Sequence, residues 1–236
     1  MKKAIFISAV SLLFTALHAA NILLAGDSTC ADYTEKSAPQ TGWGQALPQF
    51  CKDSCKVLNC AVPGTSSRSF IDRKFWDGLL AKVQKGDFVI IQFGHNDSKK
   101  NHNRFAAPGA VYDANLKKFI ADVRAKGANP VIATSIVRAN FKKGKIAPGN
   151  LNNYRQACFN VGKAENVPVV DLLTETKTYF EKLGPAETDK LFMCSSGNEK
   201  KKNDRTHVNK AGAEIIAKLF VESAKKQNLP IAECFK

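Results

Sequence analysis

Five short apolar runs recur along the chain, and polar or glycine-containing segments separate them. The runs are NILLA (21–25), KVLNCA (56–61), DFVIIQF (87–93), NPVIATSIV (129–137) and VPVVDL (167–172). Turn-forming residues bound each run, and polar residues do not alternate within it. This pattern is typical of strands that are buried on both faces, so we expect five β-strands.

Segments with helical periodicity lie between and after these runs. They are WGQALPQFC (43–51), RKFWDGLLAKVQ (73–84), YDANLKKFIADVRAK (112–126), NNYRQACFNVGKAE (152–165) and NKAGAEIIAKLFVESAKKQ (209–227). Strands that alternate with helices predict a parallel sheet covered on both sides. We therefore expect an α/β fold with three α/β/α layers and a flavodoxin-like, five-stranded parallel sheet. No repeat or linker interrupts it, so residues 21–236 are predicted to form a single domain.

The first twenty residues, MKKAIFISAVSLLFTALHAA, have the composition of a secretory signal peptide. Two lysines precede an apolar stretch, and small residues follow it, which is the order of a charged, an apolar and a cleavable region. The apolar stretch is shorter than the roughly 20 residues that span a bilayer. We therefore expect residues 1–20 to be a signal peptide that is cleaved after Ala19 or Ala20. The mature protein is then expected to be secreted or periplasmic and not to insert into a membrane.

The net charge of +14 is consistent with an acidic partner, although a solvated cationic surface is the commoner reason for such a charge. The lysines are scattered, and no basic helix carries interleaved aromatic residues, so nucleic acid is not expected as a partner. Seven cysteines in an exported chain favour some disulfides, and the odd number leaves at least one thiol unpaired. Cys51, Cys55 and Cys60 lack the C-x-x-C pairs of a zinc site, so no metal is expected.

Residues able to carry out acyl transfer follow the predicted strands at their carboxyl ends, where open parallel sheets bind ligands. The first strand leads to GDS with Ser28, the second to a loop with Gly64, and the third to FGHNDS with Asn96. Asp204 and His207 stand just before the last helix. A serine hydroxyl needs a neighbouring base that a third group orients. We therefore expect His207 to be the base for Ser28, with Asp204 orienting its ring.

The tetrahedral intermediate of acyl transfer also needs preorganised hydrogen-bond donors. The backbone N–H groups of Ser28 and Gly64 and the side-chain amide of Asn96 are the candidates for this oxyanion hole. Each motif alone is better explained by a turn or a helix cap. Four separated segments that supply complementary parts of one site favour the chemical interpretation.

The remaining polar residues of these loops receive separate interpretations. Arg68 and Arg138 are candidates for binding a uronate carboxylate, and are otherwise surface arginines or ion-pair partners. His95 and Asp97 are predicted to have structural roles beside Asn96. Asp27 is expected to hold its loop, and Trp43 to pack at the start of a helix.

The order GDS, Gly64, GHND and DRTH resembles the SGNH (GDSL-type) hydrolase superfamily. The segments AGDST, TGWG, N-x-A-x-x-G before SSRSF, FGHND, LGPAETDKLF and DRTHVNKAGAEIIA are most similar to bacterial rhamnogalacturonan acetylesterases. The resemblance implies the SGNH hydrolase fold, Ser28, Asp204 and His207 as the catalytic residues, and Ser28, Gly64 and Asn96 as the oxyanion hole. It implies no cofactor.

These observations together predict a serine esterase that deacetylates an acidic, pectic polysaccharide such as rhamnogalacturonan, and we expect it to act as a monomer. Two alternatives stay open. The first is an SGNH esterase that acts on acetylated xylan or on lipid esters, because VPGTSSRSF and the lysine-rich loop before DRTH depart from the family pattern near the predicted groove. The second is a catalytically inert carbohydrate-binding protein.

Overall fold

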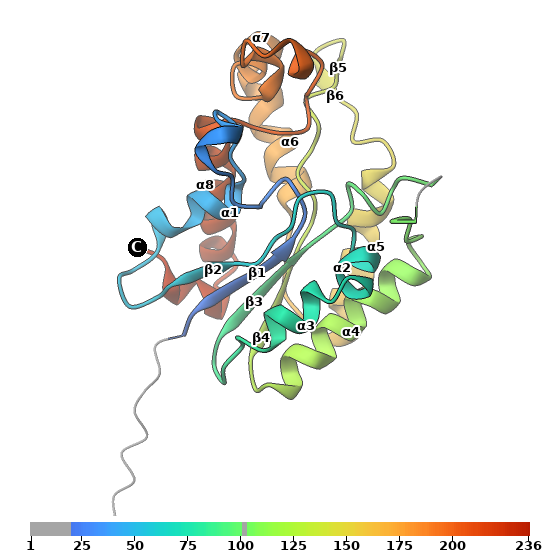
Figure 1. Ribbon diagram of the computed structural model, residues 1–236, viewed down its shortest axis with the longest axis vertical. Helices are drawn as coiled ribbons and strands as arrows, with labels where there is room; N and C mark the ends of the chain where they lie inside the picture. Colours follow the sequence, from blue (N-terminus) through green and yellow to red (C-terminus); the bar gives the residue numbers. More distant parts are fainter. Residues whose placement is uncertain (1–19, 101–102) are drawn as a thin grey trace, which may run out of the picture.

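The computed structural model describes residues 20–100 and 103–236 (Figure 1). The predicted signal peptide therefore lies outside the described residues, apart from Ala20.

Five parallel strands form the central sheet, in the order β2-β1-β3-β4-β7. Their bounds are β1 Ile22–Gly26, β2 Val57–Asn59, β3 Phe88–Gln92, β4 Asn129–Ala133 and β7 Val169–Val170. Leu24 of β1 pairs with Asn59 on one side and with Ile90 on the other, so β1 lies inside the sheet. Each strand falls largely within a predicted apolar run, which confirms the five-stranded α/β prediction.

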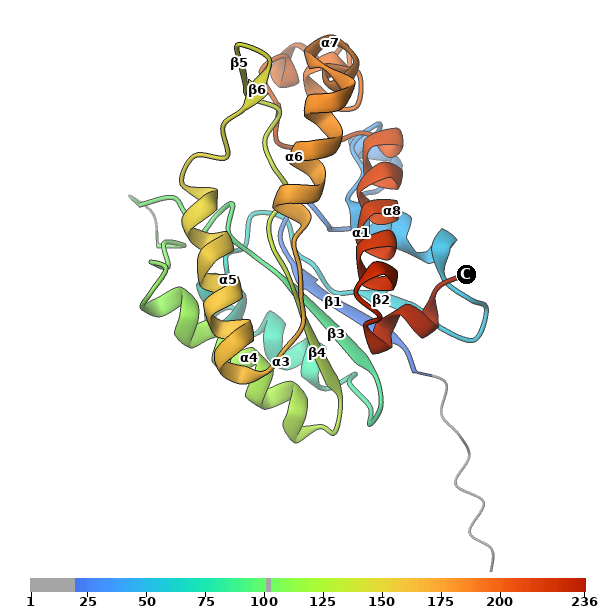
Figure 2. The same ribbon diagram turned by 180° about the vertical axis from the view of Figure 1, so that it is seen from behind.

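Helices cover both faces of this sheet. Their bounds are α1 Trp43–Ala46, α2 Ser67–Asp72, α3 Phe75–Leu80, α4 Val111–Ala125, α5 Leu151–Glu165, α6 Leu172–Leu183, α7 Pro185–Asp189 and α8 Lys210–Lys226. Helices α2 to α5 lie on one face, and α1, α6 and α8 lie on the other, as Figures 1 and 2 show from opposite sides.

The side chains of β1 explain why two layers of helices are needed. Ile22 and Leu24 point into the core shared with α1, α6 and α8. Leu23 and Ala25 point into the core shared with α2 to α5. All four are fully buried, because successive side chains of a strand face opposite sides of the sheet. A continuous apolar run is therefore what a strand between two cores requires.

Several local features differ from the sequence-based expectation, and helices α2, α6 and α7 lie outside the predicted helical segments. The helix expected over 43–51 ends at Ala46 and continues as a 3₁₀ turn over Leu47–Phe50, because Pro48 has no N–H to extend the helix. The segment 73–84 is helical only over Phe75–Leu80. The chain after β4 contains an antiparallel hairpin, β5 Phe141–Lys142 and β6 Lys145–Ile146.

Trp43 packs at the start of α1, as predicted. Its side chain is fully buried and stacks on Phe220 of α8, with the ring centroids 5.3 Å apart. The indole Nε1 donates a hydrogen bond of 2.9 Å to Oε1 of Gln92, at the end of β3. Trp43 thus joins α1, α8 and the carboxyl edge of the sheet.

The seven cysteines are all free thiols, so the expected disulfides are not present. Within residues 20–100 and 103–236, no group of three or more histidine, cysteine, aspartate or glutamate side chains is arranged to hold a metal ion. No helix in the same residues combines the length and the apolar character that crossing a membrane requires.

Candidate active site

A tight turn presents Ser28 at the carboxyl end of β1. The Asp27 carboxylate accepts hydrogen bonds from Thr29 N (2.9 Å) and Thr29 Oγ1 (2.8 Å), which closes the turn around Ser28. Gly26 permits this close packing, because a Cβ at that position would overlap Cys30 Sγ. The GDST sequence is therefore a turn, as its composition suggests, and the turn displays the Ser28 hydroxyl.

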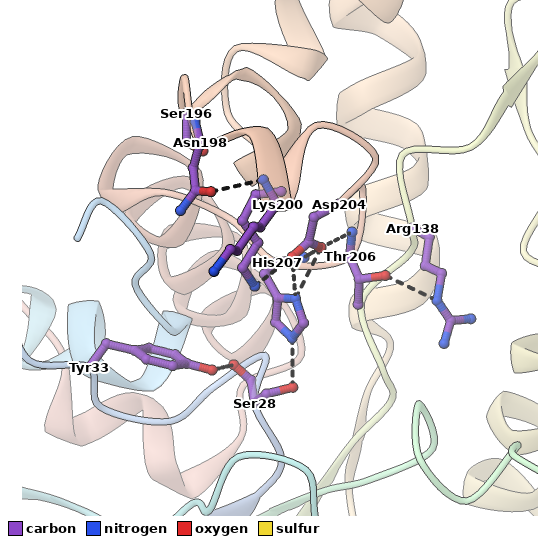
Figure 3. A network of polar contacts seen from close by, with 10 residues as sticks. Ser28, Tyr33, Arg138, Ser196, Asn198, Lys200, Asp204, Thr206 and His207 are labelled. Carbon is purple, nitrogen blue, oxygen red and sulfur yellow. Dashed lines mark hydrogen bonds and ion pairs between the residues drawn. The ribbon is translucent and has the colours of Figure 1, made fainter. Parts of the chain in front are cut away.

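The loop before α8 brings His207 to Ser28, although 179 positions separate the two residues in the sequence. His207 Nε2 lies 2.8 Å from Ser28 Oγ, and His207 Nδ1 lies 2.9 Å from Asp204 Oδ2 (Figure 3). A carboxylate can only accept a hydrogen bond, so Nδ1 donates to Asp204 and Nε2 accepts from the Ser28 hydroxyl in the neutral ring. Hydroxyl, imidazole and carboxylate thus form one hydrogen-bonded chain.

Asp204 is held in its ionised form. Its half-buried position alone would raise its pKa, but hydrogen bonds from the His207 side chain and backbone outweigh burial, and the pKa falls well below its usual range. Lys201 contributes a further donor, because its Nζ lies 3.0 Å from Asp204 Oδ2. An ionised carboxylate in this position orients the imidazole ring and stabilises its protonated form.

Two further loops reach the same edge of the sheet through a series of hydrogen bonds. Val62 N and Thr65 Oγ1 donate to Gly26 O at 3.0 Å and 3.2 Å, which ties the loop after β2 to the end of β1. Asn96 Nδ2 donates to Thr65 O at 2.7 Å, which ties the loop after β3 to the loop after β2. Gly64 lies in the left-handed region with φ +80°, which glycine adopts without strain.

Three N–H groups in the turns and loops that follow β1, β2 and β3 remain available at this edge of the sheet. In the part of the chain that the structure describes, the backbone N–H groups of Ser28 and Gly64 donate to no protein acceptor. The Asn96 amide carries a second N–H besides the one bonded to Thr65 O. N–H donors of this kind, at the same edge of the sheet as the Ser28 hydroxyl, are the groups that an oxyanion hole requires.

Buried acidic and imidazole groups underlie the loop after β3. Asp97 Oδ1 accepts a 2.9 Å hydrogen bond from Ser67 N at the start of α2, and burial raises the Asp97 pKa to about 7. Burial lowers the His95 pKa well below its ordinary value, so its ring is neutral. The His95 side chain is almost fully buried, and the structural role expected for it stays a prediction.

Asp27 is also buried, and burial raises its pKa. Its hydrogen bonds to Thr29 show that it holds the loop around Ser28, as expected, while Asp204 is the carboxylate hydrogen-bonded to His207.

The two candidate arginines lie in different surroundings. Arg138 lies beside the site, where its Nε donates to Thr206 Oγ1 at 3.2 Å (Figure 3). Arg68 lies on α2 with its side chain about half exposed, and forms a 3.6 Å ion pair with Asp72.

Three residues with contacts at the site were not identified from the sequence. Lys201 was visible only as part of the lysine-rich segment 199–204, three positions before Asp204. Tyr33 donates a 2.8 Å hydrogen bond to Ser28 O, and Arg104 donates a 2.7 Å hydrogen bond to Gly64 O. No motif marks Tyr33 or Arg104, because only folding brings them to their partners.

Residues 24–215 match the GDSL-like Lipase/Acylhydrolase family. The chain is 35% identical to the rhamnogalacturonan acetylesterase RhgT of Bacillus subtilis, over 90% of this chain and 92% of that protein. It is 30% identical to a rhamnogalacturonan acetylesterase of Emericella nidulans, over 94% and 91% of the two chains. Among solved structures, the protein YxiM of Bacillus subtilis superposes with a TM-score of 0.79 and 28% identity, covering 89% of this chain and 57% of that one.

Proposed function

This chain belongs to the GDSL-like Lipase/Acylhydrolase family and is a carboxylic ester hydrolase, and on that premise we propose that it removes O-acetyl groups from rhamnogalacturonan. The observation that carries the proposal is the 2.8 Å hydrogen bond between Ser28 Oγ and His207 Nε2, continued by His207 Nδ1 to Asp204. We further propose that Ser28 is the nucleophile, His207 the general base and Asp204 the residue that orients it.

The first half of the reaction forms an acetyl-enzyme. Ser28 Oγ attacks the acetyl carbonyl carbon while its proton passes to His207 Nε2, and Asp204 stabilises the resulting imidazolium. The negative charge develops on the carbonyl oxygen, where the N–H groups of Ser28 and Gly64 and the amide of Asn96 receive it. When the tetrahedral intermediate collapses, the C–O bond to the sugar breaks and His207 returns the proton to the sugar oxygen.

The second half of the reaction regenerates the enzyme. Water takes the position of the departed sugar hydroxyl and gives a proton to His207 Nε2 as it attacks the acetyl carbonyl. The same donors stabilise the second oxyanion, and collapse returns the proton to Ser28 Oγ and releases acetate. The cycle needs neither a metal nor an organic cofactor.

The charge distribution supports an acidic polysaccharide as the substrate. The sequence has a net charge of +14, and Arg138 stands beside the site with only part of its surface exposed. We propose that Arg138 binds a uronate carboxylate near the acetylated residue, and Arg68 on α2 is a second candidate. A cleft between the β5–β6 hairpin and α7, lined by Phe141, Lys142 and Pro185 among others, offers space for neighbouring saccharides.

We propose that the chain is exported through residues 1–20 and acts as a monomer, which would place it where acetylated pectin is found outside the cytoplasm.

Acetate release from a panel of substrates tests this function. Acetylated rhamnogalacturonan, acetylated homogalacturonan, acetylated xylan and a long-chain acyl ester are compared with the wild type and the Ser28→Ala variant. The proposal predicts the highest kcat/KM on acetylated rhamnogalacturonan and almost none in the variant. A preference for acetylated xylan or for the acyl ester would overturn the assignment of rhamnogalacturonan as the substrate. Absence of turnover on every ester would favour an inert carbohydrate-binding protein.

A further inference from the structure

Arg104 connects the two loops that carry the proposed oxyanion donors. Its Nη1 donates a hydrogen bond of 2.7 Å to Gly64 O, in the loop after β2. The same nitrogen lies 3.4 Å from Asn96 Oδ1, in the loop after β3. The side chain is partly buried, and it lies within neither a helix nor a strand. A single guanidinium nitrogen is thus shared between the two loops.

The contacts of the Asn96 amide fix its orientation. Its oxygen faces the Arg104 guanidinium, and its Nδ2 donates to Thr65 O at 2.7 Å. Rotation of the amide by 180° would place an NH₂ group against a cation and an oxygen against a carbonyl oxygen, so both contacts would become repulsive. One N–H therefore remains directed away from Thr65 and is available to a substrate.

Arg104 lies directly against the Gly64 backbone. A Cβ at Gly64 would lie 3.4 Å from Arg104 Nη1, at the near limit of ordinary van der Waals contact. The requirement for glycine comes from the positive φ of Gly64, because L side chains rarely adopt it. The hydrogen bond from Arg104 to Gly64 O holds the peptide that follows Gly64, and so restrains the loop that presents the Gly64 N–H.

We propose that Arg104 is a positioning residue for the oxyanion hole: it holds the Asn96 amide and the Gly64 loop in the arrangement that receives the developing negative charge. This inference rests on the proposed function. A cation beside Asn96 Oδ1 also polarises the amide, which strengthens the hydrogen bond that its N–H donates. Both effects act on the transition state, so the loss of Arg104 is expected to lower kcat more than it raises KM.

The hydrolysis of 4-nitrophenyl acetate tests this role, because this small neutral ester has no carboxylate for an arginine to bind. Arg104→Met retains much of the volume and removes the charge and the donors, and we expect it to lower kcat by about ten- to a hundredfold with little change in KM. Arg104→Lys, which keeps the charge, is expected to recover part of that loss. Arg124→Met is the matched control, because Arg124 Nη2 also donates to backbone carbonyls, those of Glu165 and Asn166, away from the site.

A double-mutant cycle with Asn96→Ala separates this role from a merely structural one. If Arg104 acts through the Asn96 amide, Arg104→Met should reduce kcat much less in the Asn96→Ala background than in the wild type. Equal losses in both backgrounds would show that Arg104 does not act through the Asn96 amide, and would overturn that half of the proposal. Urea unfolding of each variant at the assay temperature shows that the compared proteins are folded.

The remaining outcomes distinguish this inference from the proposed function. A wild-type kcat for Arg104→Met on 4-nitrophenyl acetate overturns the positioning role. If the same variant then loses activity only on acetylated rhamnogalacturonan, Arg104 is instead a substrate-binding residue. If Ser28→Ala retains wild-type turnover of 4-nitrophenyl acetate, the proposed function fails, and the role of Arg104 fails with it.

Discussion

The substitution Asp97→Asn should remove a pH dependence from the stability of this protein. Burial raises the Asp97 pKa, and the nearby charge of Asp27 raises it further. Hydrogen bonds from Ser67 oppose this rise only in part, so the pKa is about 7. In the described residues Asp97 Oδ2 has no hydrogen-bond partner, so the ionised carboxylate is poorly compensated in the fold. An asparagine keeps an oxygen for Ser67 and does not titrate.

The sign follows from proton binding in the two states. Between pH 4 and pH 7 the folded protein keeps the Asp97 proton, whereas the unfolded chain has lost it. The stabilisation is therefore complete below the unfolded pKa of 3.8 and disappears as the pH rises through about 7. A difference of about three pKa units, at about 1.4 kcal/mol each, gives a contribution on the order of 4 kcal/mol.

Urea unfolding measures this contribution, with the fluorescence of the two buried tryptophans, Trp43 and Trp76, as the probe. The free energy of unfolding of the wild type relative to Asp97→Asn should fall by about 4 kcal/mol between pH 4 and pH 8. Asp53→Asn removes the same charge from an exposed side chain, and its difference from the wild type should stay nearly flat. Parallel wild-type and Asp97→Asn curves would refute the reasoning, because they would show that Asp97 ionises alike in both states.

Two further predictions concern the substrate and the packing around the Ser28 loop. Arg138→Gln should lower kcat/KM on acetylated rhamnogalacturonan about tenfold and leave 4-nitrophenyl acetate hydrolysis unchanged, if Arg138 binds a carboxylate. Arg68→Gln removes the same charge from an exposed side chain, and a larger loss for this variant than for Arg138→Gln would contradict the assignment. Gly42→Ala should destabilise the fold by at least about 1–3 kcal/mol in urea unfolding, because its Cβ would overlap Ala31 O and lie 2.5 Å from Cys30 C. An unchanged unfolding midpoint would show that this backbone contact relaxes freely.

The sheet could be predicted from the sequence because its strands are buried on both faces. Runs such as DFVIIQF (87–93) show neither polar alternation nor helical spacing, and β3 occupies Phe88–Gln92 within that run. The alternation of strands with helices then predicted a parallel sheet with helices on both faces. The hairpin β5–β6 was missed, because each of its strands has only two residues and carries no periodic pattern.

The residues of the candidate site could be predicted from the sequence only in part. Ser28, Gly64 and Asn96 follow strands at their carboxyl ends, so the topology alone places them at one edge of the sheet. The contacts of Arg104 with Gly64 and Asn96 depend instead on how a long side chain bends back across a loop. Neither hydropathy nor spacing records such a contact.

Labelling with a fluorophosphonate tests the central claim most directly, because this reagent forms a covalent bond with a serine that a neighbouring base activates. The wild-type protein is treated with the reagent, digested and analysed by mass spectrometry, alongside the Ser28→Ala and His207→Ala variants. We expect one adduct, on the peptide that contains Ser28, no adduct in Ser28→Ala and greatly slowed labelling in His207→Ala. An adduct on a different residue, or a wild type that releases acetate without being labelled at Ser28, would contradict the account.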